Sequence, residues 1–455
     1  MTRIVLLGLS LMIIVLNFGC SSGNNDIEFG DLMEVNEKIQ EHYFSDYCKD
    51  FENLDMDRHE IISSFVGDYG LATKLFSERN DAYEPHLKFE NNQVDMTGIK
   101  DFLQKKIESH QVNDLERIVS ERTLEVINRT DDLEKLFQSY SIKDAKTFIA
   151  NKAKNYHFTT INESHHSGQN RAFTRDLLQP MWDNGYRYLA LEAFSQRDSL
   201  MCDLKYPTFE TGFYFRDSNL GNLVREALSI GYTLIQYDVS TNQNLNLDER
   251  ENLRDISQAN NIYRKTLKKD AIGKVLIHSG FDHQLEFSLS DDREAMGAAL
   301  KRISGKEIFT INQNVMVENS KKENDYYKQA HISFKINEPS VFINEETQSC
   351  LVDPIKYLGG IDVQVYHPKT EYKNGRPNWM VGDKSNFYKL PDDIIKQYEG
   401  HLLTVRPKDE PVNSTPVDQF IINSQRQLIL PKGNFTMNII DCNKTLVAKI
   451  PIINN

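Results

Sequence analysis

The chain has 455 residues, of which 39% are hydrophobic and 26% charged; this is the composition of a globular protein and excludes a disordered or fibrous chain. At about 150 residues per domain, the length favours about three structural units. The 66 acidic residues outnumber the 53 Lys and Arg, so the formal net charge is −13. Because nucleic acids and anionic membrane surfaces are also negative, we expect no nucleic-acid partner and no non-specific binding to such surfaces.

The N-terminus is typical of an export signal. Arg3 precedes an apolar run from Ile4 to Leu16, which is shorter than the ~20 residues of a membrane-spanning helix and fits a signal-peptide core. Gly19 directly precedes Cys20, as in the cleavage site of bacterial lipoproteins, where this Cys is acylated. We therefore expect residues 1–19 to be a lipoprotein signal peptide and Cys20 to carry the lipid, palmitate included. A plain secretory signal is the alternative.

The signal also predicts where the protein resides. Residues 20–30 begin as a Ser/Gly/Asn stretch, which is typical of a flexible tether. Ser21, in place of Asp, resembles lipoproteins that are sent on to the outer membrane. The expected partner is therefore the lipid bilayer, reached through acylated Cys20. The expected location is the outer membrane or cell envelope, facing the periplasm or the cell surface.

The remaining cysteines show no metal-binding or redox motif. They are widely and irregularly spaced, and no CxxC pair occurs, so a zinc ribbon or a thioredoxin-type site is unsupported. An oxidising exterior permits disulfides. Pairing of Cys350 with Cys442 is one expectation, and a free buried thiol is the other. The four positions are Cys48, Cys202, Cys350 and Cys442.

Residues 31–150 are predicted to be a helical N-terminal region. Apolar residues lie on one helical face from Asp114 to Ile127, and the same spacing returns from Leu133 to Phe137. Ser141 is the expected N-cap of a helix that begins near Lys143. No chemistry stands out in this region, so we expect it to act as a cap or scaffold.

The sequence pattern differs in residues 151–395, where short β-rich runs alternate with amphipathic helical stretches. This alternation predicts an α/β fold with a mainly parallel sheet and flanking helices. Pro180 is expected to kink or end the helix that contains it. The expected strands are residues 157–161, 186–191, 232–237, 274–277 and 307–311, with helices at 168–184, 220–230 and 248–269 and an added strand or two within 352–366. Short β runs separated by turns then predict a small β-rich C-terminal module over residues 396–455.

Ionisable side chains follow four of these strands. In an open parallel sheet, ligands bind outside the carboxyl ends of the strands, so these groups should meet in one crevice. Charged groups next to a buried sheet need partners or a function. The candidates are Glu163, His165 and His166 after the first strand, Glu192 after the second, Asp238 after the third, and His278 and His283 at the fourth.

Two mechanisms fit such a crevice. In the first, an imidazole takes a proton from a water that the carboxylates orient, and the water hydrolyses an ester or amide. In the second, a divalent cation held by the same groups lowers the pKa of a bound water. The sequence has no GxSxG, GxGxxG or P-loop motif, so a serine α/β-hydrolase and a nucleotide-binding enzyme are unsupported.

The segment from Ile161 to His166, followed by a helix and then by Tyr188 to Phe194, resembles the superfamily of erythromycin esterases, ChaN-like haem-uptake lipoproteins and Tiki-type peptidases. Those proteins begin with a strand that ends in a Glu-plus-His loop and a second strand that ends in Glu. They carry a later strand followed by a small-residue turn and His, which Val275 to His283 resembles. The resemblance covers about residues 155–315.

The resemblance implies roles for these residues. Glu163 and Glu192 would polarise a water or hold a metal, and His166 would be the general base, as in the esterase branch. His165 matches the shorter spacing of the ChaN-like branch, so the choice between the two histidines stays open. His283 would stabilise charge or bind the metal, for which Glu163, His165 and Glu192 are the other candidate ligands.

The implied function is hydrolysis of an ester or amide in a small-molecule or peptide substrate. The alternative is a surface lipoprotein that binds haem or a small ligand without catalysis. Asp238, His278 and His165 are candidates for substrate binding. Arg216, in an aromatic-rich stretch from Phe213 to Asp217, could bind an anionic group, and a packed loop over the sheet edge is the other interpretation.

Overall fold

The computed structural model describes most of the chain from residue 27 onward. The export signal, Cys20, Cys202 and the helix expected over residues 114–127 lie outside the described residues. Within the described part, no helix has the length and apolar character needed to cross a bilayer. The described residues are 27–38, 43–48, 56–83, 89–90, 93–94, 104–105, 107–108, 133–195, 204–239, 247–290, 293–318, 323–353, 360–382, 385–423 and 426–455.

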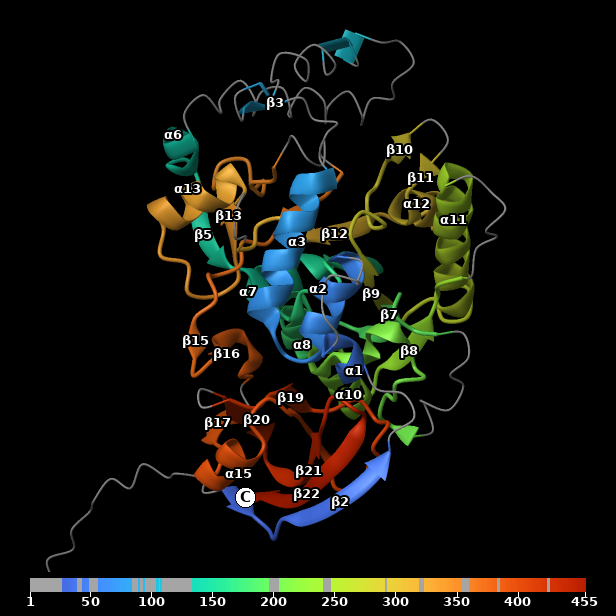
Figure 1. Cartoon of the computed structure of the whole chain (residues 1–455). Helices are drawn as coiled ribbons and strands as arrows, with labels where there is room; N and C mark the ends of the chain where they lie inside the picture. The colour runs from blue at the N-terminus through green and yellow to red at the C-terminus, as the bar shows by residue number, and fades with distance from the viewer. Residues whose placement is uncertain are drawn as a thin grey trace, which may run out of the picture.

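A six-stranded sheet runs through the middle of the molecule, and the α/β class is confirmed (Figure 1). Every neighbouring pair in this sheet is parallel. All five expected strands are present, and a short sixth strand lies at the edge, within residues 352–366. In order across the sheet the strands are β14 (Val363–Gln364), β12 (Ile308–Asn312), β6 (Phe158–Glu163), β9 (Lys274–Gly280), β7 (Tyr186–Leu191) and β8 (Thr233–Gln236).

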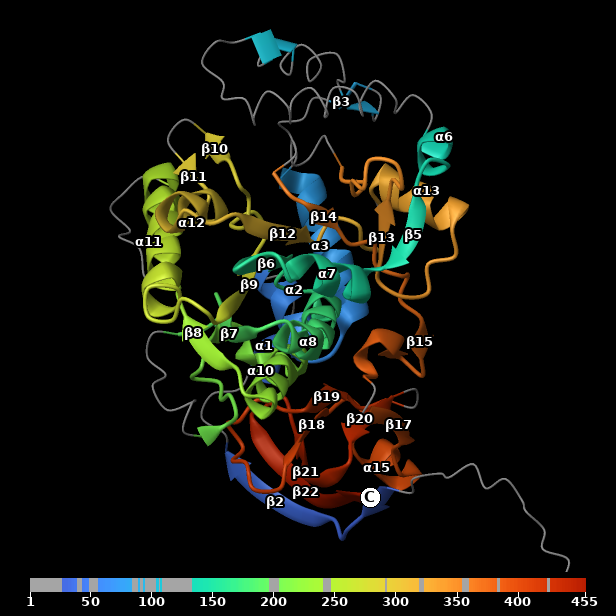
Figure 2. The same cartoon turned by 180° about the vertical axis from the view of Figure 1, so that it is seen from behind.

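Helices cover both faces of this sheet, as Figures 1 and 2 show from opposite sides. α7, α8 and α10 share a buried apolar cluster on one face, and α11 and α12 share another on the opposite face. Their bounds are α7 (Ala145–Ala153), α8 (Gly168–Asp183), α10 (Ser218–Ile230), α11 (Leu247–Lys265) and α12 (Met296–Ser304).

The two helix layers follow from the alternation of side chains along each strand. In β7, Leu189 and Leu191 pack with α8 and α10, whereas Ala190 packs with α11 and α12. In β9, Leu276 faces the first layer and Val275 the second. Because both faces are buried, these strands are continuous apolar runs, and the sequence therefore reveals them clearly.

Two local expectations differ from the structure. Ser141 does not cap a helix; it begins strand β5 (Ser141–Asp144), which pairs antiparallel with β13 (Ser340–Ile343). The cap is Asp144, whose carboxylate accepts the Thr147 amide at 2.7 Å. Pro180 does not end α8 early, because the helix continues to Asp183; whether it kinks the helix stays a prediction.

The last part of the chain forms an antiparallel sheet that also contains the first described strands. Figure 1 shows β2 along the edge of this sheet beside β22. Both β1 and β2, from the expected tether and helical region, pair with β22. The members are β1 (Ile27–Phe29), β2 (Met33–Lys38), β18 (Leu402–Pro407), β19 (Asp418–Ile421), β21 (Gly433–Ile440) and β22 (Thr445–Asn454), with β17 (Ser385–Lys389) and β20 (Gln427–Pro431) paired beside them.

The described part of residues 31–150 therefore contains both strands and helices. Three helices lie near its start, and α1 and α2 share a buried apolar cluster with Leu402, Ile440 and Leu446 of the C-terminal sheet, whereas α3 extends away from that sheet (Figure 1). The other described elements are α1 (Phe44–Tyr47), α2 (Met56–Phe65), α3 (Tyr69–Tyr83), α6 (Leu133–Phe137), α13 (Asp325–Ser333), α15 (Asp392–Gln397), the 3-10 helices η2 (Phe213–Arg216) and η3 (Asn378–Met380), and strands β3 (Phe89–Glu90), β4 (Gln93–Val94), β10 (Ser288–Ser290), β11 (Arg293–Glu294), β15 (Tyr372–Lys373) and β16 (Arg376–Pro377).

A disulfide joins the two ends of the described chain. Cys48, directly after α1, is bonded to Cys442, between β21 and β22, across 394 residues of sequence. The expected pairing of Cys350 with Cys442 is therefore wrong, and Cys350 is a free thiol. Burial raises the pKa of Cys350 to about 12, so this thiol is neutral and unreactive at ordinary pH.

We expect Cys48→Ala to lower the free energy of unfolding by about 2–4 kcal/mol, because the bridge no longer restricts the unfolded chain. Urea denaturation followed by circular dichroism measures the change. Cys350→Ala is the matched control: its stability should fall when dithiothreitol is added, whereas that of Cys48→Ala should not. Equal stability of the unaltered protein with and without dithiothreitol would contradict this expectation.

Candidate functional site

The carboxyl ends of the central strands bring the predicted acids and histidines to one edge of the sheet. Because the strands are parallel, the residues that follow them emerge on the same side. The register places Glu163 beside Gly280 and places Leu191 beside His278, so Glu192 comes directly after that pair. The strand order β6-β9-β7 therefore puts the two glutamates on either side of β9.

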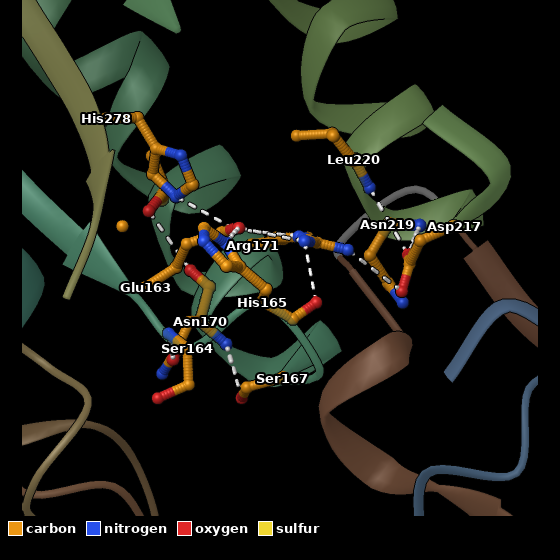
Figure 3. Close-up of polar contacts among 12 residues, drawn as sticks. Glu163, Ser164, His165, Ser167, Asn170, Arg171, Asp217, Asn219, Leu220 and His278 are labelled. Atoms are coloured by element: carbon orange, nitrogen blue, oxygen red, sulfur yellow. Dashed lines mark hydrogen bonds and ion pairs between the residues drawn. The ribbon is translucent and has the colours of Figure 1, made fainter. Parts of the chain in front are cut away.

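Glu163 is held by a buried arginine from the start of α8 (Figure 3). Nε of Arg171 lies 2.7 Å from Oε2 of Glu163, and Nη2 lies 2.8 Å from Oε1. Nη1 lies 3.3 Å from Oδ2 of Asp217, the N-cap residue of α10. The side chains of Arg171 and Asp217 are 0% exposed and that of Glu163 is 4% exposed. One buried cation thus links the end of β6 to the start of α10.

This pairing fixes the charge on Glu163. Burial raises the pKa of the Glu163 carboxyl, but the Arg171 guanidinium more than offsets burial, so the pKa is well below 4.5. Burial has the larger effect on Asp217, whose pKa is raised despite the same guanidinium. Glu163 is therefore a permanent carboxylate, unsuited to donate a proton, and its role is to hold its neighbours.

The two adjacent histidines point to different places. Nδ1 of His165 lies 3.0 Å from Oε1 of Glu163, and its ring stacks on Tyr214 with the centroids 4.4 Å apart. The His166 ring stacks instead on Phe76 of α3, at 4.0 Å. The structure thus places His165, and not His166, beside Glu163.

Gly280 allows His165 and Glu192 to meet. A Cβ atom at this position would lie 2.5 Å from Cε1 of His165 and 3.2 Å from Oε2 of Glu192. The Gly280 amide donates a hydrogen bond to Oε2 of Glu192. A residue without a side chain is therefore needed here, because an imidazole and a carboxylate both approach the backbone closely.

Glu192 is paired with a second arginine. Nη2 of Arg254, on α11, lies 2.6 Å from Oε1 of Glu192, and its Nε lies 2.9 Å from Oδ1 of Asp238 after β8. The Asp238 carboxylate also accepts a hydrogen bond from Gln258 at 2.7 Å. Asp238 therefore joins the cluster by holding Arg254 in place. The Arg254 side chain is 20% exposed, so this half of the cluster reaches the surface whereas the Arg171 half does not.

His283 completes the accessible half. Its Nδ1 is hydrogen-bonded to Oδ1 of buried Asp255, and its Nε2 lies 3.1 Å from Nη1 of Arg254 and 3.6 Å from Oε1 of Glu192. Arginine can only donate, so in this arrangement Nε2 accepts and Nδ1 carries the proton that is given to Asp255. The imidazole is therefore oriented with a lone pair toward Glu192 and Arg254.

The pKa values of the histidines differ by environment. Burial lowers the pKa of His283, but Glu192 and Asp255 more than offset burial and raise it above 6.5. Burial dominates at His278, whose pKa is lowered although its Nε2 lies 3.5 Å from Oε2 of Glu163. Burial also raises the pKa of Glu192, yet His283 and Arg254 lower it to about 2. The environment of His283 therefore favours its charged form, whereas burial favours the neutral form of His278.

The donor set does not fit a resident divalent metal. Within the described residues, no group of three or more His, Cys, Asp or Glu side chains could hold a metal ion. Glu163 and Glu192, two of the four candidate ligands, each bind an arginine guanidinium, which would repel a cation. We therefore derive no step through a metal.

Arg216 lies apart from the hydrogen bonds of this cluster. Its guanidinium packs over the rings of Phe209 and Phe213, with centroid distances of 5.7 and 5.5 Å. Its Nη1 donates to the Phe213 carbonyl at 2.9 Å. These contacts favour the interpretation of this aromatic-rich stretch as a packed loop over the interpretation of Arg216 as an anion-binding residue.

Sequence reasoning missed the charged residues that hold the cluster together. Arg171 is buried on α8 with Thr174 and Leu178, which follow it at helical spacing. A charged residue on the buried face of an amphipathic helix was the available signal. Arg254 and Asp255 gave a weaker signal, because α11 has many charged positions; Asp255 differs from them by its burial and Arg254 by its partners Glu192 and Asp238.

No protein-family model and no curated protein matches this chain. Several solved structures share partial similarity with it. The type III effector HopBA1 has 11% identity and a TM-score of 0.30 over 41% of this chain and 92% of its own. A structure of bacterial protein toxins has 14% identity and a TM-score of 0.32 over 64% and 67%. RRSP, a MARTX toxin effector domain from Vibrio vulnificus CMCP6, has 13% identity and a TM-score of 0.27 over 59% and 62%.

We expect Arg171→Met to destabilise the protein by about 3–5 kcal/mol, because it leaves Glu163 and Asp217 as buried charges without their cation. Thermal and urea unfolding measure the change. Arg302→Ala is the matched control, since Arg302 forms a similar 2.6 Å pair with Glu294 but is 57% exposed; it should cost less than about 1 kcal/mol. Similar costs for the two variants would contradict a structural role for the buried cation.

Proposed function

We propose that this protein is an extracytoplasmic hydrolase that cleaves an ester or amide bond at the Glu/His cluster, which consists of Glu163, His165, Glu192 and His283 with the residues that hold them. The observation that supports the proposal most is the pair of Asp255 and His283. A buried carboxylate fixes the tautomer of an imidazole whose other nitrogen faces a second acid and an arginine at a partly open edge. This is the arrangement that a general base requires.

In the proposed reaction, the Nη1–H of Arg254 that Nε2 of His283 accepts turns to the carbonyl oxygen of the bound substrate, and the freed Nε2 takes a proton from a water near Glu192. The resulting hydroxide attacks the substrate carbonyl carbon and forms a tetrahedral intermediate. Negative charge develops on the carbonyl oxygen, and the Arg254 guanidinium stabilises it. When the intermediate collapses, the bond to the leaving alcohol or amine breaks, and His283 returns the proton to that leaving group. Asp255 orients the imidazole throughout.

His165 supplies the second imidazole at this edge. Nδ1 of His165 is hydrogen-bonded to Glu163. The other ring nitrogen of His165, Nε2, lies near Gly280, which Glu192 also approaches. We assign His165 to binding the substrate by a hydrogen bond and Glu163 to positioning His165. Asp238 likewise positions Arg254. Under this proposal His165 and His283 act, and His166 does not.

We also propose that the protein is anchored to the cell envelope through acylated Cys20. The apolar N-terminal run and Gly19 before Cys20 support this location. The disulfide between Cys48 and Cys442 supports it independently, because disulfides persist in oxidising compartments and are rare in the cytosol.

We expect Glu192→Gln and His283→Ala each to lower kcat/KM by about 100- to 10,000-fold on any hydrolysed substrate, because each removes part of the acid–base machinery. A panel of p-nitrophenyl esters, p-nitroanilides and fluorogenic peptides measures turnover, and circular dichroism checks the fold. His401→Ala, in the C-terminal sheet, is the matched control and should retain activity. Unchanged kcat/KM in both variants would overturn the proposal. A Soret band on adding haem, with no turnover of any substrate, would favour the haem-binding alternative.

The pH profile provides a second test. His283 must be neutral to accept a proton, so kcat/KM should fall as the pH decreases through its pKa, which is above 6.5. Asp255→Asn removes a charge that raises this pKa, and we expect the acidic limb of the profile to move to lower pH while the maximal rate falls. Asp325→Asn is the exposed control and should leave the limb in place. An acidic limb that does not move in Asp255→Asn would exclude His283 as the base.

A further inference from the structure

A cavity of about 260 Å³ lies on the other side of the loop that carries Glu163 and His165. Its floor is the start of α8 and the loop before it, and α3, the segment after β12 and the β15–η3 region form its walls. None of the residues assigned to hydrolysis lines it. The residues that matter for its chemistry are Tyr69, Lys74, Glu318, Glu323, Tyr372 and Trp379, together with His166 and Gln169.

Aromatic rings form one wall of the cavity. The rings of Tyr69 and Trp379 pack edge to face with their centroids 5.0 Å apart. Gly168 fits tightly under both, because a Cβ there would lie 2.8 Å from each ring. The Tyr69 hydroxyl is fixed by a 2.7 Å hydrogen bond from Asn219. The wall is therefore preorganised, and Tyr372, at 50% exposure, extends it toward solvent.

Two carboxylates and one lysine face the aromatic wall. Oε2 of Glu318 accepts the Thr370 amide at 2.9 Å, which fixes this side chain at the rim. Glu323 lies 3.3 Å from Lys369 and is 16% exposed. Lys74 extends from α3. The lining holds two carboxylates and one lysine, and Lys369 pairs with Glu323 from outside it, so no excess of positive charge favours an anion although the N-terminus of α8 is near.

We propose that this cavity binds one pyranose ring of a neutral saccharide. A sugar ring presents apolar C–H faces, which suit the rings of Trp379 and Tyr372. Its rim of hydroxyl groups can donate to carboxylates such as Glu318 and accept from Lys74 and from the amide of Gln169. A half-open cavity with aromatic walls and a few placed polar groups is a form that small-molecule sites take. The proposal does not depend on the hydrolase function.

The chain contains only two tryptophans, Trp182 and Trp379, which makes a direct test simple. Trp182 packs against Tyr232 and Arg187 and does not line the cavity. In Trp182→Phe, Trp379 is the sole tryptophan and reports on the cavity. We expect D-glucose or N-acetyl-D-glucosamine to change its fluorescence in a saturable way, and inorganic phosphate to have no effect.

Variants then locate the binding. In the Trp182→Phe background, Glu318→Gln and Tyr372→Ala should each weaken the affinity at least tenfold, whereas Glu346→Gln, on an exposed turn, should not. Isothermal titration of the unaltered chain provides a second readout that does not depend on fluorescence. A response to phosphate in place of the sugars would overturn the assignment in favour of an anion site. No saturable response to either sugar, or equal affinity in Glu318→Gln, would also overturn it.

Discussion

Arg171 places a full positive charge where no water reaches it, and the architecture of the site depends on how that charge is compensated. A buried ion is tolerated only when it is paired and hydrogen-bonded. Glu163 at the end of β6 and Asp217 at the start of α10 supply two carboxylates, and the His165 carbonyl accepts a further hydrogen bond at 2.8 Å. The guanidinium thereby fixes the position of a strand end, a helix start and the loop between them.

Each half of the Glu/His cluster pairs a glutamate with an arginine, but the two pairs have different roles. Glu163 with Arg171 is fully buried, so its charge is locked and serves positioning. Glu192 with Arg254 reaches the surface, where a carboxylate and a guanidinium can act on a bound molecule. Gly280 on β9 lies between the halves and lets them approach each other. The geometry therefore separates a buried support from an accessible rim, and the proposed hydrolysis uses this separation.

The sequence predicted the central strands and the residues that follow them, because short β-rich runs alternate with helical patterns and end in ionisable residues. Other features have no local signature. The choice between His165 and His166 depends on an irregular loop without periodicity. The pairing of β1 and β2 with β22, and the bond from Cys48 to Cys442, join residues far apart in the chain. Arg171 resembles an ordinary charged helix residue until its burial is known, and Arg254 until its partners are known.

The sharing of one sheet by β1, β2 and β22 has a consequence for biosynthesis. Strands β1 and β2 are made long before their partner β22 (Thr445–Asn454). Until β22 has been made, the two early segments lack the strand with which they pair. Exposed strand edges pair readily with other chains. Such a chain would benefit from a holding chaperone until β22 is available, and a deletion of residues 446–455 would leave both early segments open to aggregation.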